Sequence, residues 1–298
     1  MKQKIIVVVG PTASGKSALG VLLAKRFNGE VISADSRQVY KGLDIGTGKI
    51  TKREMKGIPH HLLDVASVKK RYSAGDFVRD GHVAISRIAA RGKVPIIVGG
   101  TGFYTDALVG RITLPEVVPN AKLRASLGEK TAPQLYTLLR RRDPARARMM
   151  ASKSERNNKV RLVRALEVAL AHPKLPSRKQ VPLYDIFWIG IAPPTSLLEK
   201  KMRTRLNARI RKGMVAEAQK LKRGGLSYAR MKELGLEYRS LARFLQKEIT
   251  RSEFEEELYR DIRRYAKKQL AYWRRNDEIS WFQKPGKVAN DLAHWLEQ

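Results

Sequence analysis

A glycine-rich segment that follows an apolar run constrains the fold of this chain more than any other feature. Residues 10–17 read Gly-Pro-Thr-Ala-Ser-Gly-Lys-Ser and fit the pattern G-x-x-x-x-G-K-[ST]. The β-branched run Ile5–Val9 precedes it, and the helical pattern Ser17–Phe27 follows and stops at Asn28-Gly29. A strand, a glycine loop and a helix in this order predict a phosphate-binding loop in a parallel α/β sheet.

The predicted loop offers several kinds of phosphate ligand. Its glycines let successive N–H groups converge on phosphate oxygens, Lys16 adds a positive charge, and Ser17 is placed to ligate Mg²⁺. We expect phosphate contacts from Gly10, Thr12, Ala13, Ser14, Gly15, Lys16 and Ser17. The pattern does not specify the compound, because ATP or another nucleotide and an alkyl diphosphate all offer adjacent phosphate groups.

Further apolar runs complete the predicted sheet. Val31–Ser33, Val94–Val98 and Tyr184–Ile191 are expected to be strands, and the region before the last of them is helical in pattern and rich in arginine. We therefore predict a P-loop NTPase-like, doubly wound parallel α/β sheet with an inserted helical subdomain. The predicted parts are the first part of the core (1–118), the inserted helical subdomain (119–180), and the rest of the core with basic C-terminal helices (181–298).

Composition narrows the choice of partners. Lys and Arg number 60 against 28 Asp and Glu, a formal charge of +32, which predicts a polyanionic partner unless the charge only aids solubility. The absence of cysteine excludes disulfides, thiolate nucleophiles and Cys-ligated metals. No apolar run approaches the roughly 20 residues that span a bilayer, so we expect a cytoplasmic protein without a membrane partner. We also expect a monomer.

Asp35 follows the second predicted strand and should reach the same sheet edge as the phosphate loop. The residue could accept a proton from a nucleophile, hold Mg²⁺ through water, or cap a turn. Ser36, Arg37 and Gln38 add donors and acceptors that could contact a base or a ribose. From residue 35 alone, an ATP-dependent small-molecule kinase is equally possible.

Six segments together carry a resemblance to a known family. They are GPTASGKS, ISADSRQVYKGLDIGTGK, GIPHHLLD, YSAGDF, PIIVGGTGFY and RALEV, and they fall within residues 4–170. Their order and spacing resemble the tRNA dimethylallyltransferase (isopentenyltransferase) family, bacterial type. The resemblance implies an enzyme that moves a dimethylallyl group from its diphosphate to the N6 amine of the adenosine on the 3′ side of a tRNA anticodon.

The resemblance also implies roles for individual residues. The phosphate loop would hold dimethylallyl diphosphate with Mg²⁺, and Arg205 would contact the diphosphate, although Arg209 and Arg211 lie close by in the sequence. Asp35 would take a proton from the adenine amine, and Thr101 would orient that amine. The alternative for Thr101 is an ordinary turn threonine.

Contacts to the tRNA anticodon stem-loop are expected on both parts of the chain. The expected residues are Asp35, Ser36, Arg37, Gln38, Thr101, Arg124, Arg161 and Arg164. For the last two, a solvated charged face with Glu167 is an equal alternative. The aromatic residues around Tyr265 and Trp273 could stack on bases or form core, and His60-His61 is expected to have a structural or turn role.

Two departures from the family pattern limit what can be transferred. Asn157-Asn158 stands where the family usually has Asn-Asp, and Gln269-Leu-Ala-Tyr-Trp273 replaces a Gln-x-Thr-Trp-like string, so neither segment receives a role. Two alternatives to prenyl transfer stay open at this point. Against a kinase, this sequence has no obvious apolar strand that ends in a second aspartate. Against a noncatalytic RNA-binding protein, such a function would leave Asp35 unexplained.

Overall fold

Six strands form one parallel sheet within the part of the chain that the computed structural model describes, residues 2–172, 183–283 and 289–297. The strands are β1 (Lys4–Val9), β2 (Gly29–Ala34), β3 (His60–His61), β4 (Val94–Gly99), β5 (Asp185–Ile191) and β6 (Ser280–Phe282). Their order across the sheet is β3-β2-β4-β1-β5-β6, and every pairing is parallel. This order confirms the doubly wound fold predicted from the sequence.

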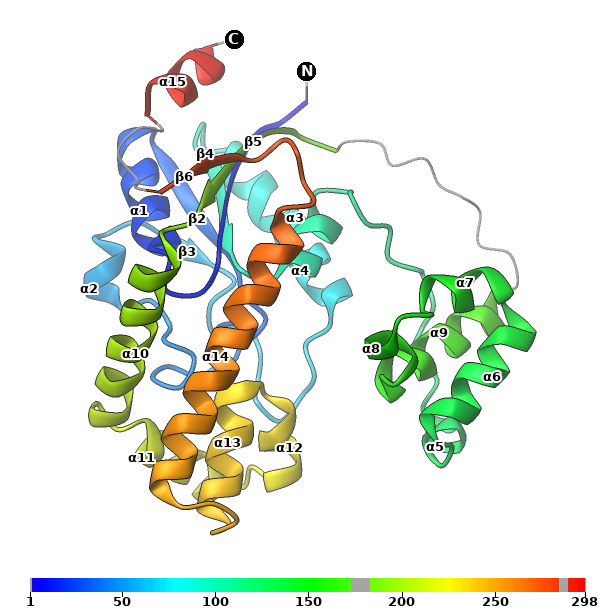
Figure 1. Ribbon diagram of the computed structural model, residues 1–298. Coiled ribbons are helices and arrows are strands. Elements are labelled where there is room, and N and C mark those ends of the chain that lie inside the picture. Colours follow the sequence, from blue (N-terminus) through cyan, green and yellow to red (C-terminus); the bar gives the residue numbers. More distant parts are fainter. Residues whose placement is uncertain (1, 173–182, 284–288, 298) are drawn as a thin grey trace. The chain divides into compact units, whose positions relative to one another are not determined.

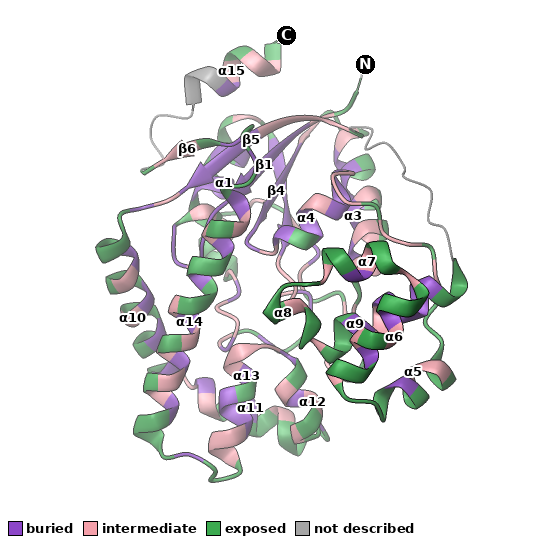
Figure 2. Cartoon of the chain, turned by 45° about the vertical axis from the view of Figure 1, so that its right-hand side comes forward, coloured by how far each residue is buried: buried purple, intermediate pink, exposed green. Residues whose placement is uncertain are grey.

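The central strands are buried on both sides, which explains their continuous apolar sequences. β1 lies between β4 and β5, so that Ile6 pairs with Ile96 on one side and Phe187 on the other. In Figure 2 these strands are coloured as buried almost throughout. The sequence prediction missed β3 and β6, because two or three residues are too short to form a periodic pattern.

Helices cover both faces of the sheet. α1 (Lys16–Arg26) and α15 (Ala289–Glu297) pack on one face, where Leu19, Leu23 and Leu292 join the core. α3 (Ala74–Ala89), α4 (Gly102–Leu108) and the end of α14 (Arg251–Trp273) pack on the other face. The short helix α2 (Lys52–Met55) lies between β2 and β3 in the chain.

A second core lies at the carboxyl ends of the strands. It is built by α10 (Thr195–Arg211), α11 (Met214–Arg223), α12 (Tyr228–Glu233), α13 (Leu236–Leu245) and α14, which gather below the sheet in Figure 1. Ala13 of the phosphate loop and Val39, Tyr40 and Leu43 after β2 belong to this core. The helices therefore support the strand-end loops directly. Gly213, with φ +103°, separates α10 from α11.

The chain divides into two compact units, residues 1–112 with 181–298, and residues 113–180. The smaller unit contains α5 (Ala121–Gly128), α6 (Ala132–Arg142), α7 (Pro144–Met149), α8 (Lys153–Arg156) and α9 (Lys159–Ala171). Leu135, Leu139 and Leu162 form the centre of its core, and its outer helix faces are exposed in Figure 2. The predicted boundary at residue 180 lies outside the described residues. No helix in the described ranges is long and apolar enough to cross a membrane.

Glu30 on β2 holds the β3 edge of the sheet through three cationic partners. Its carboxylate binds His61 Nε2 at 2.7 Å, Arg91 Nη2 at 2.7 Å and Lys93 Nζ at 3.0 Å. Burial tends to raise the pKa of Glu30, but the hydrogen bonds from these three partners outweigh burial and lower it to about 2. His61 thus has the structural role expected for it.

We expect Glu30→Gln to lower the free energy of unfolding at pH 7 by about 2 kcal/mol, because Gln cannot pair with the three cationic partners. The carboxylate's folded-state pKa lies below its unfolded value, so this stabilisation is present above about pH 4.5 and is lost as the pH falls towards 2. Urea unfolding of both proteins at pH 7 and pH 3 measures the difference. Glu248→Gln, at an exposed pair with Lys232, is the control. An equal difference at both pH values would contradict the expectation.

Candidate active site

The predicted phosphate loop connects β1 to α1 at the carboxyl edge of the sheet. Gly10 has φ +151°, and a Cβ there would lie 2.4 Å from the carbonyl oxygen of Ile191, so a larger residue does not fit. Gly15 is the N-cap of α1 with φ +100°, and no described side chain caps this helix. The N–H groups of the first turn are therefore available to an anion.

Lys16 brings a poorly solvated positive charge to the loop. Its Nζ donates a hydrogen bond to the carbonyl oxygen of Pro11 at 3.1 Å. Burial lowers the pKa of Lys16 to about 8, the carboxylate of Asp35 opposes this change, and the positive charge of Arg205 adds to it. An anion bound at the loop would stabilise the charged form of Lys16, so the site is electrostatically suited to phosphate.

Asp35 lies at the end of β2, at the edge where the phosphate loop begins. Its Oδ1 accepts hydrogen bonds from the backbone N–H groups of Arg37 at 2.8 Å and Gln38 at 3.3 Å. Asp35 therefore caps the turn that follows it, one of the roles considered from the sequence. Oδ2 accepts no hydrogen bond from any residue that the structure describes, and Asp35 lines the same pocket as Lys16. One carboxylate oxygen fixes the turn, while the other is free to accept a proton or bind a cation through water.

Thr101 lies at the end of the neighbouring strand β4. Its Oγ1 accepts a hydrogen bond from the N–H of Ser36 at 3.2 Å, and its own N–H donates to the carbonyl oxygen of Ala34 at 3.3 Å. Thr101 is thus joined to both neighbours of Asp35. Tyr265 on α14 lies near Thr101; 38% of the residue is exposed, yet partial loss of solvation raises the pKa of its hydroxyl to about 12. The sequence suggested Tyr265 only as a base-stacking or core residue, without a place beside Thr101.

Arg205, on α10, lines the pocket together with Lys16 and Asp35. Burial of its guanidinium lowers the pKa of Arg205, and the charge of Arg209 lowers it further. Arg209 instead binds the carbonyl oxygen of Gly46 at 2.7 Å and the carboxylate of Glu237 at 3.3 Å. Arg205 is therefore the arginine of this helix that faces the pocket, whereas Arg209 holds the surrounding structure together.

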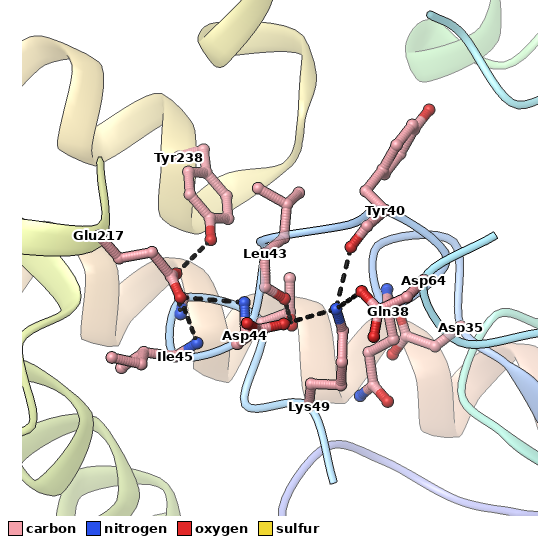
Figure 3. Close-up of polar contacts among 12 residues, drawn as sticks. Asp35, Gln38, Tyr40, Leu43, Asp44, Ile45, Lys49, Asp64, Glu217 and Tyr238 are labelled. Carbon is pink, nitrogen blue, oxygen red and sulfur yellow. Dashed lines mark hydrogen bonds and ion pairs between the residues drawn. The ribbon is translucent and has the colours of Figure 1, made fainter. Parts of the chain in front are cut away.

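Two ionic groups, half-buried Glu217 and buried Lys49, fix the loop that follows Asp35, as Figure 3 illustrates. Glu217 on α11 accepts hydrogen bonds from three successive N–H groups, those of residues 44, 45 and 46, and from the hydroxyl of Tyr238. Lys49 Nζ binds the carbonyl oxygen of Tyr40 at 2.9 Å and the carboxylates of Asp44 at 2.7 Å and Asp64 at 2.5 Å. These contacts hold the intervening Thr47 and Gly48 in the pocket wall.

The pocket brings together four of the eight residues expected around the diphosphate and two of those expected around the target base. Thr12, Lys16, Ser17, Asp35, Gln38 and Arg205 line it. Gly10, Ala13 and Ser14 belong to the loop, and Ala13 and Ser14 are buried. Arg37 turns to the carbonyl oxygen of Glu233, at 3.2 Å. Sequence reasoning missed Thr47, Gly48, Ile50 and His60, which also line the pocket; only the GLDIGTGK string, next to Asp35 in sequence, could have suggested the first two.

The arginines expected to bind tRNA in the smaller unit all have glutamate partners. Arg124 forms two hydrogen bonds with the buried carboxylate of Glu167, at 2.9 and 2.7 Å, and Arg164 also binds Glu167. These contacts lower the pKa of Glu167 to about 2 in spite of its burial. Arg161 pairs with Glu155. Arg164 and Glu167 thus form an ion pair, but around a buried carboxylate rather than on the solvated charged face that was the alternative.

Comparison with known proteins identifies the family. Residues 38–276 match the family model described as IPP transferase. The chain belongs to the IPP transferase family. The match includes Gln38, Thr101 and Arg205 but begins after the phosphate loop, whose assignment therefore depends on its own sequence and geometry.

Relatives and solved structures of this family resemble the chain over nearly its whole length. The tRNA dimethylallyltransferase of Leuconostoc citreum is 38% identical over 99% of both chains, and tRNA dimethylallyltransferase 2 of Treponema denticola is 40% identical over 95% of this chain and 97% of its own. The crystal structure of the tRNA isopentenylpyrophosphate transferase of Bacillus halodurans has a TM-score of 0.75 at 34% identity, covering 99% of this chain and 97% of that one. A eukaryotic dimethylallyltransferase captured acting on tRNA has a TM-score of 0.83 at 25% identity, covering 98% of this chain and 77% of that one.

We expect Lys16 to make pyrophosphate binding by this IPP transferase family member dependent on pH. Its positive charge is lost as the pH rises through about 8, so affinity should fall relative to Lys16→Arg, whose charge persists. Calorimetric titration with inorganic pyrophosphate and Mg²⁺ at pH 7 and pH 9.5 gives the ratio of the two affinities. We expect the ratio to change by roughly tenfold, whereas Lys25→Arg, at the exposed end of α1, should behave as wild type. A constant ratio would exclude Lys16 as the titrating group.

Proposed function

We propose that the chain transfers the dimethylallyl group of dimethylallyl diphosphate to the N6 amine of the adenosine on the 3′ side of a tRNA anticodon, as a monomer in the cytoplasm. The observation that carries this proposal is the convergence of Lys16, Arg205 and the free oxygen of Asp35 in one pocket. The two cations suit a diphosphate, and the carboxylate suits a nucleophile that must lose a proton. The family membership of the chain and the names of its relatives support the same reaction.

In this proposal the phosphate loop binds the leaving group. Lys16, Arg205 and the uncapped N-terminus of α1 contact the diphosphate. When the bond between the allylic carbon and the diphosphate oxygen breaks, negative charge grows on that oxygen, and these fixed groups stabilise it. The allylic fragment spreads its positive charge over the double bond. No covalent bond to the protein is needed.

The residues at the loop also fit a magnesium ion. Mg²⁺ prefers oxygen ligands and is commonly bound by one or two protein groups together with substrate phosphates. The Ser17 hydroxyl would be one ligand, and Asp35 could contact the ion through water. Within the described ranges no three His, Asp or Glu side chains group into a site of their own, which fits an ion held mainly by the diphosphate. When bound, the ion would neutralise charge on the departing diphosphate.

Asp35 and Thr101 act on the nucleophile. The lone pair of the adenine amine is delocalised into the ring, so the nitrogen becomes a better nucleophile as it loses a proton. The free oxygen of Asp35 accepts that proton while the nitrogen forms its bond to the allylic carbon. Thr101, joined to Ser36 beside Asp35, orients the amine, and Gln38, which lines the same pocket as Asp35, would contact the base. The products are diphosphate, the alkylated adenine and protonated Asp35.

Extruding the adenine from the anticodon loop requires a surface that holds the tRNA. The exposed arginines 140, 141, 142 and 148 of the smaller unit have no acidic partner among the residues that the structure describes, and we assign them to tRNA phosphates. Arg124, Arg161 and Arg164 stay candidates, since their side chains are 35–62% exposed. Ser36 and Arg37 would contact the loop near the target base.

The kinase alternative rests only on features that both reactions share. A phosphate loop and an aspartate serve phosphoryl transfer equally well. The family membership of the chain favours prenyl transfer, and so does a charge of +32, which a small substrate does not require.

Replacement of Asp35 should separate these functions. With unmodified tRNA, Mg²⁺ and labelled dimethylallyl diphosphate, we expect Asp35→Asn to lower the single-turnover rate by about 10²–10⁴-fold, because the variant lacks the proton acceptor. Asp277→Asn, at an exposed acid between α14 and β6, is the control. A parallel reaction replaces the prenyl donor with ATP. Phosphorylated product without prenyl transfer would overturn the proposal in favour of a kinase.

Binding of tRNA should weaken steeply with salt, because each phosphate contact releases condensed counterions. We expect Arg141→Gln combined with Arg142→Gln to reduce the slope of log affinity against log salt by about 1–2 units. The matched control removes the same charge from the end of α1 through Lys25→Gln and Arg26→Gln, at the opposite edge of the sheet from the pocket. Filter binding between 50 and 300 mM salt measures both. Equal slopes for the two double variants would contradict the assigned surface.

A further inference from the structure

One face of α14 contacts three consecutive residues at the end of β4. Tyr265, Gln269 and Tyr272 are spaced four and three residues apart, so they lie on the same side of the helix. Gln269 meets Gly100, the Tyr265 hydroxyl lies near Thr101, and the Tyr272 ring lies against Gly102, where a Cβ would approach it to 2.1 Å. This face carries the segment to which the sequence alone assigned no role.

Gln269 also reaches the phosphate loop. Its Oε1 accepts a hydrogen bond from the N–H of Thr12 at 2.8 Å, and its Nε2 donates to the carbonyl oxygen of Gly100 at 3.0 Å. The residue is only 6% exposed. A primary amide has its acceptor and its donor on different atoms, so one side chain can join an N–H to a C=O. Neither a carboxylate nor an aliphatic side chain offers both.

The two loops joined by Gln269 leave neighbouring strands. β1 and β4 are paired up to Val9 and Gly99, where the backbone ladder ends. Beyond that point Gln269 provides the link between them. One loop carries Lys16, and the other carries Thr101 one residue after the bonded carbonyl.

We propose that Gln269 is a positioning residue that sets the distance between the phosphate loop and Thr101. The inference rests on the proposed function, in which the first loop holds the departing diphosphate and Thr101 orients the attacking amine. Each loop keeps its own local contacts without Gln269, since Thr101 is bound to Ser36 and Ala34, and Lys16 to Pro11. Loss of the amide therefore leaves each substrate its binding groups but removes their mutual alignment. Misplacement of about 1 Å can cost roughly a hundredfold in rate.

The first test separates binding from chemistry. We expect Gln269→Leu to lower the single-turnover rate of prenyl transfer at least tenfold, while the affinities for inorganic pyrophosphate and for tRNA, measured separately, stay within about threefold of wild type. Gln246→Leu at the C-cap of α13, where the amide bonds only to the carbonyl oxygen of Ala242, is the control and should match wild type. A rate within threefold of wild type, or a loss of pyrophosphate affinity as large as the loss of rate, would overturn the inference.

A second test uses the close approach of Gly100. A Cβ at this residue would lie 2.1 Å from Nε2 of Gln269, so Gly100→Ala should displace the amide and slow the reaction. Once Gln269→Ala has removed the amide, adding Gly100→Ala should cost less than threefold more. Additive losses in this double-mutant cycle would contradict the link. Wild-type protein that transfers no prenyl group would instead contradict the proposed function itself, and melting temperatures identify any variant that does not fold.

Discussion

The pocket depends on one constraint, the close parallel packing of β2, β4 and β1. At Gly99 a Cβ would lie 2.1 Å from the carbonyl oxygen of Ala34, so glycine lets β2 and β4 stay in contact to their last residues. Asp35 and Thr101 lie just after the ends of β2 and β4, and the phosphate loop begins where β1 ends. The carboxyl ends of adjacent parallel strands therefore bring together residues that are far apart in the sequence.

The charged groups inside the pocket differ from those around it in how fully they are paired. Around the pocket, Glu217 and Lys49 are satisfied by several partners each, and they fix the loop after Asp35. Within the pocket, burial lowers the pKa values of Lys16 and Arg205, and Asp35 is the only carboxylate lining it among the described residues. Incompletely compensated cations are unfavourable in the free protein and favourable once a dianion binds. The uncompensated positive charge of the fold therefore lies where binding of an anionic ligand would neutralise it.

The sequence predicted those parts of the pocket that depend on residues adjacent in the chain. The four long strands, the phosphate loop and the placement of Asp35 follow from apolar runs and from a motif of adjacent residues. Gln269 and Tyr265 could not be placed in the same way, since they reach the site from a helix more than 160 residues beyond Thr101. Helical spacing shows that such residues share a face, but the packing of α14 decides what that face contacts.

The ion pairs of the arginines in the smaller unit also could not be predicted in full from the sequence. The sequence places Arg164 three residues before Glu167, a spacing that allows an ion pair, but it does not reveal that Arg124 approaches the same carboxylate from α5. Because buried Glu167 needs cationic partners, it holds two arginines that composition alone would count towards nucleic-acid binding. The arginines at the end of α6 have no such partner within the described part of the chain. A basic surface is therefore better judged by which positive charges lack an internal carboxylate than by net charge.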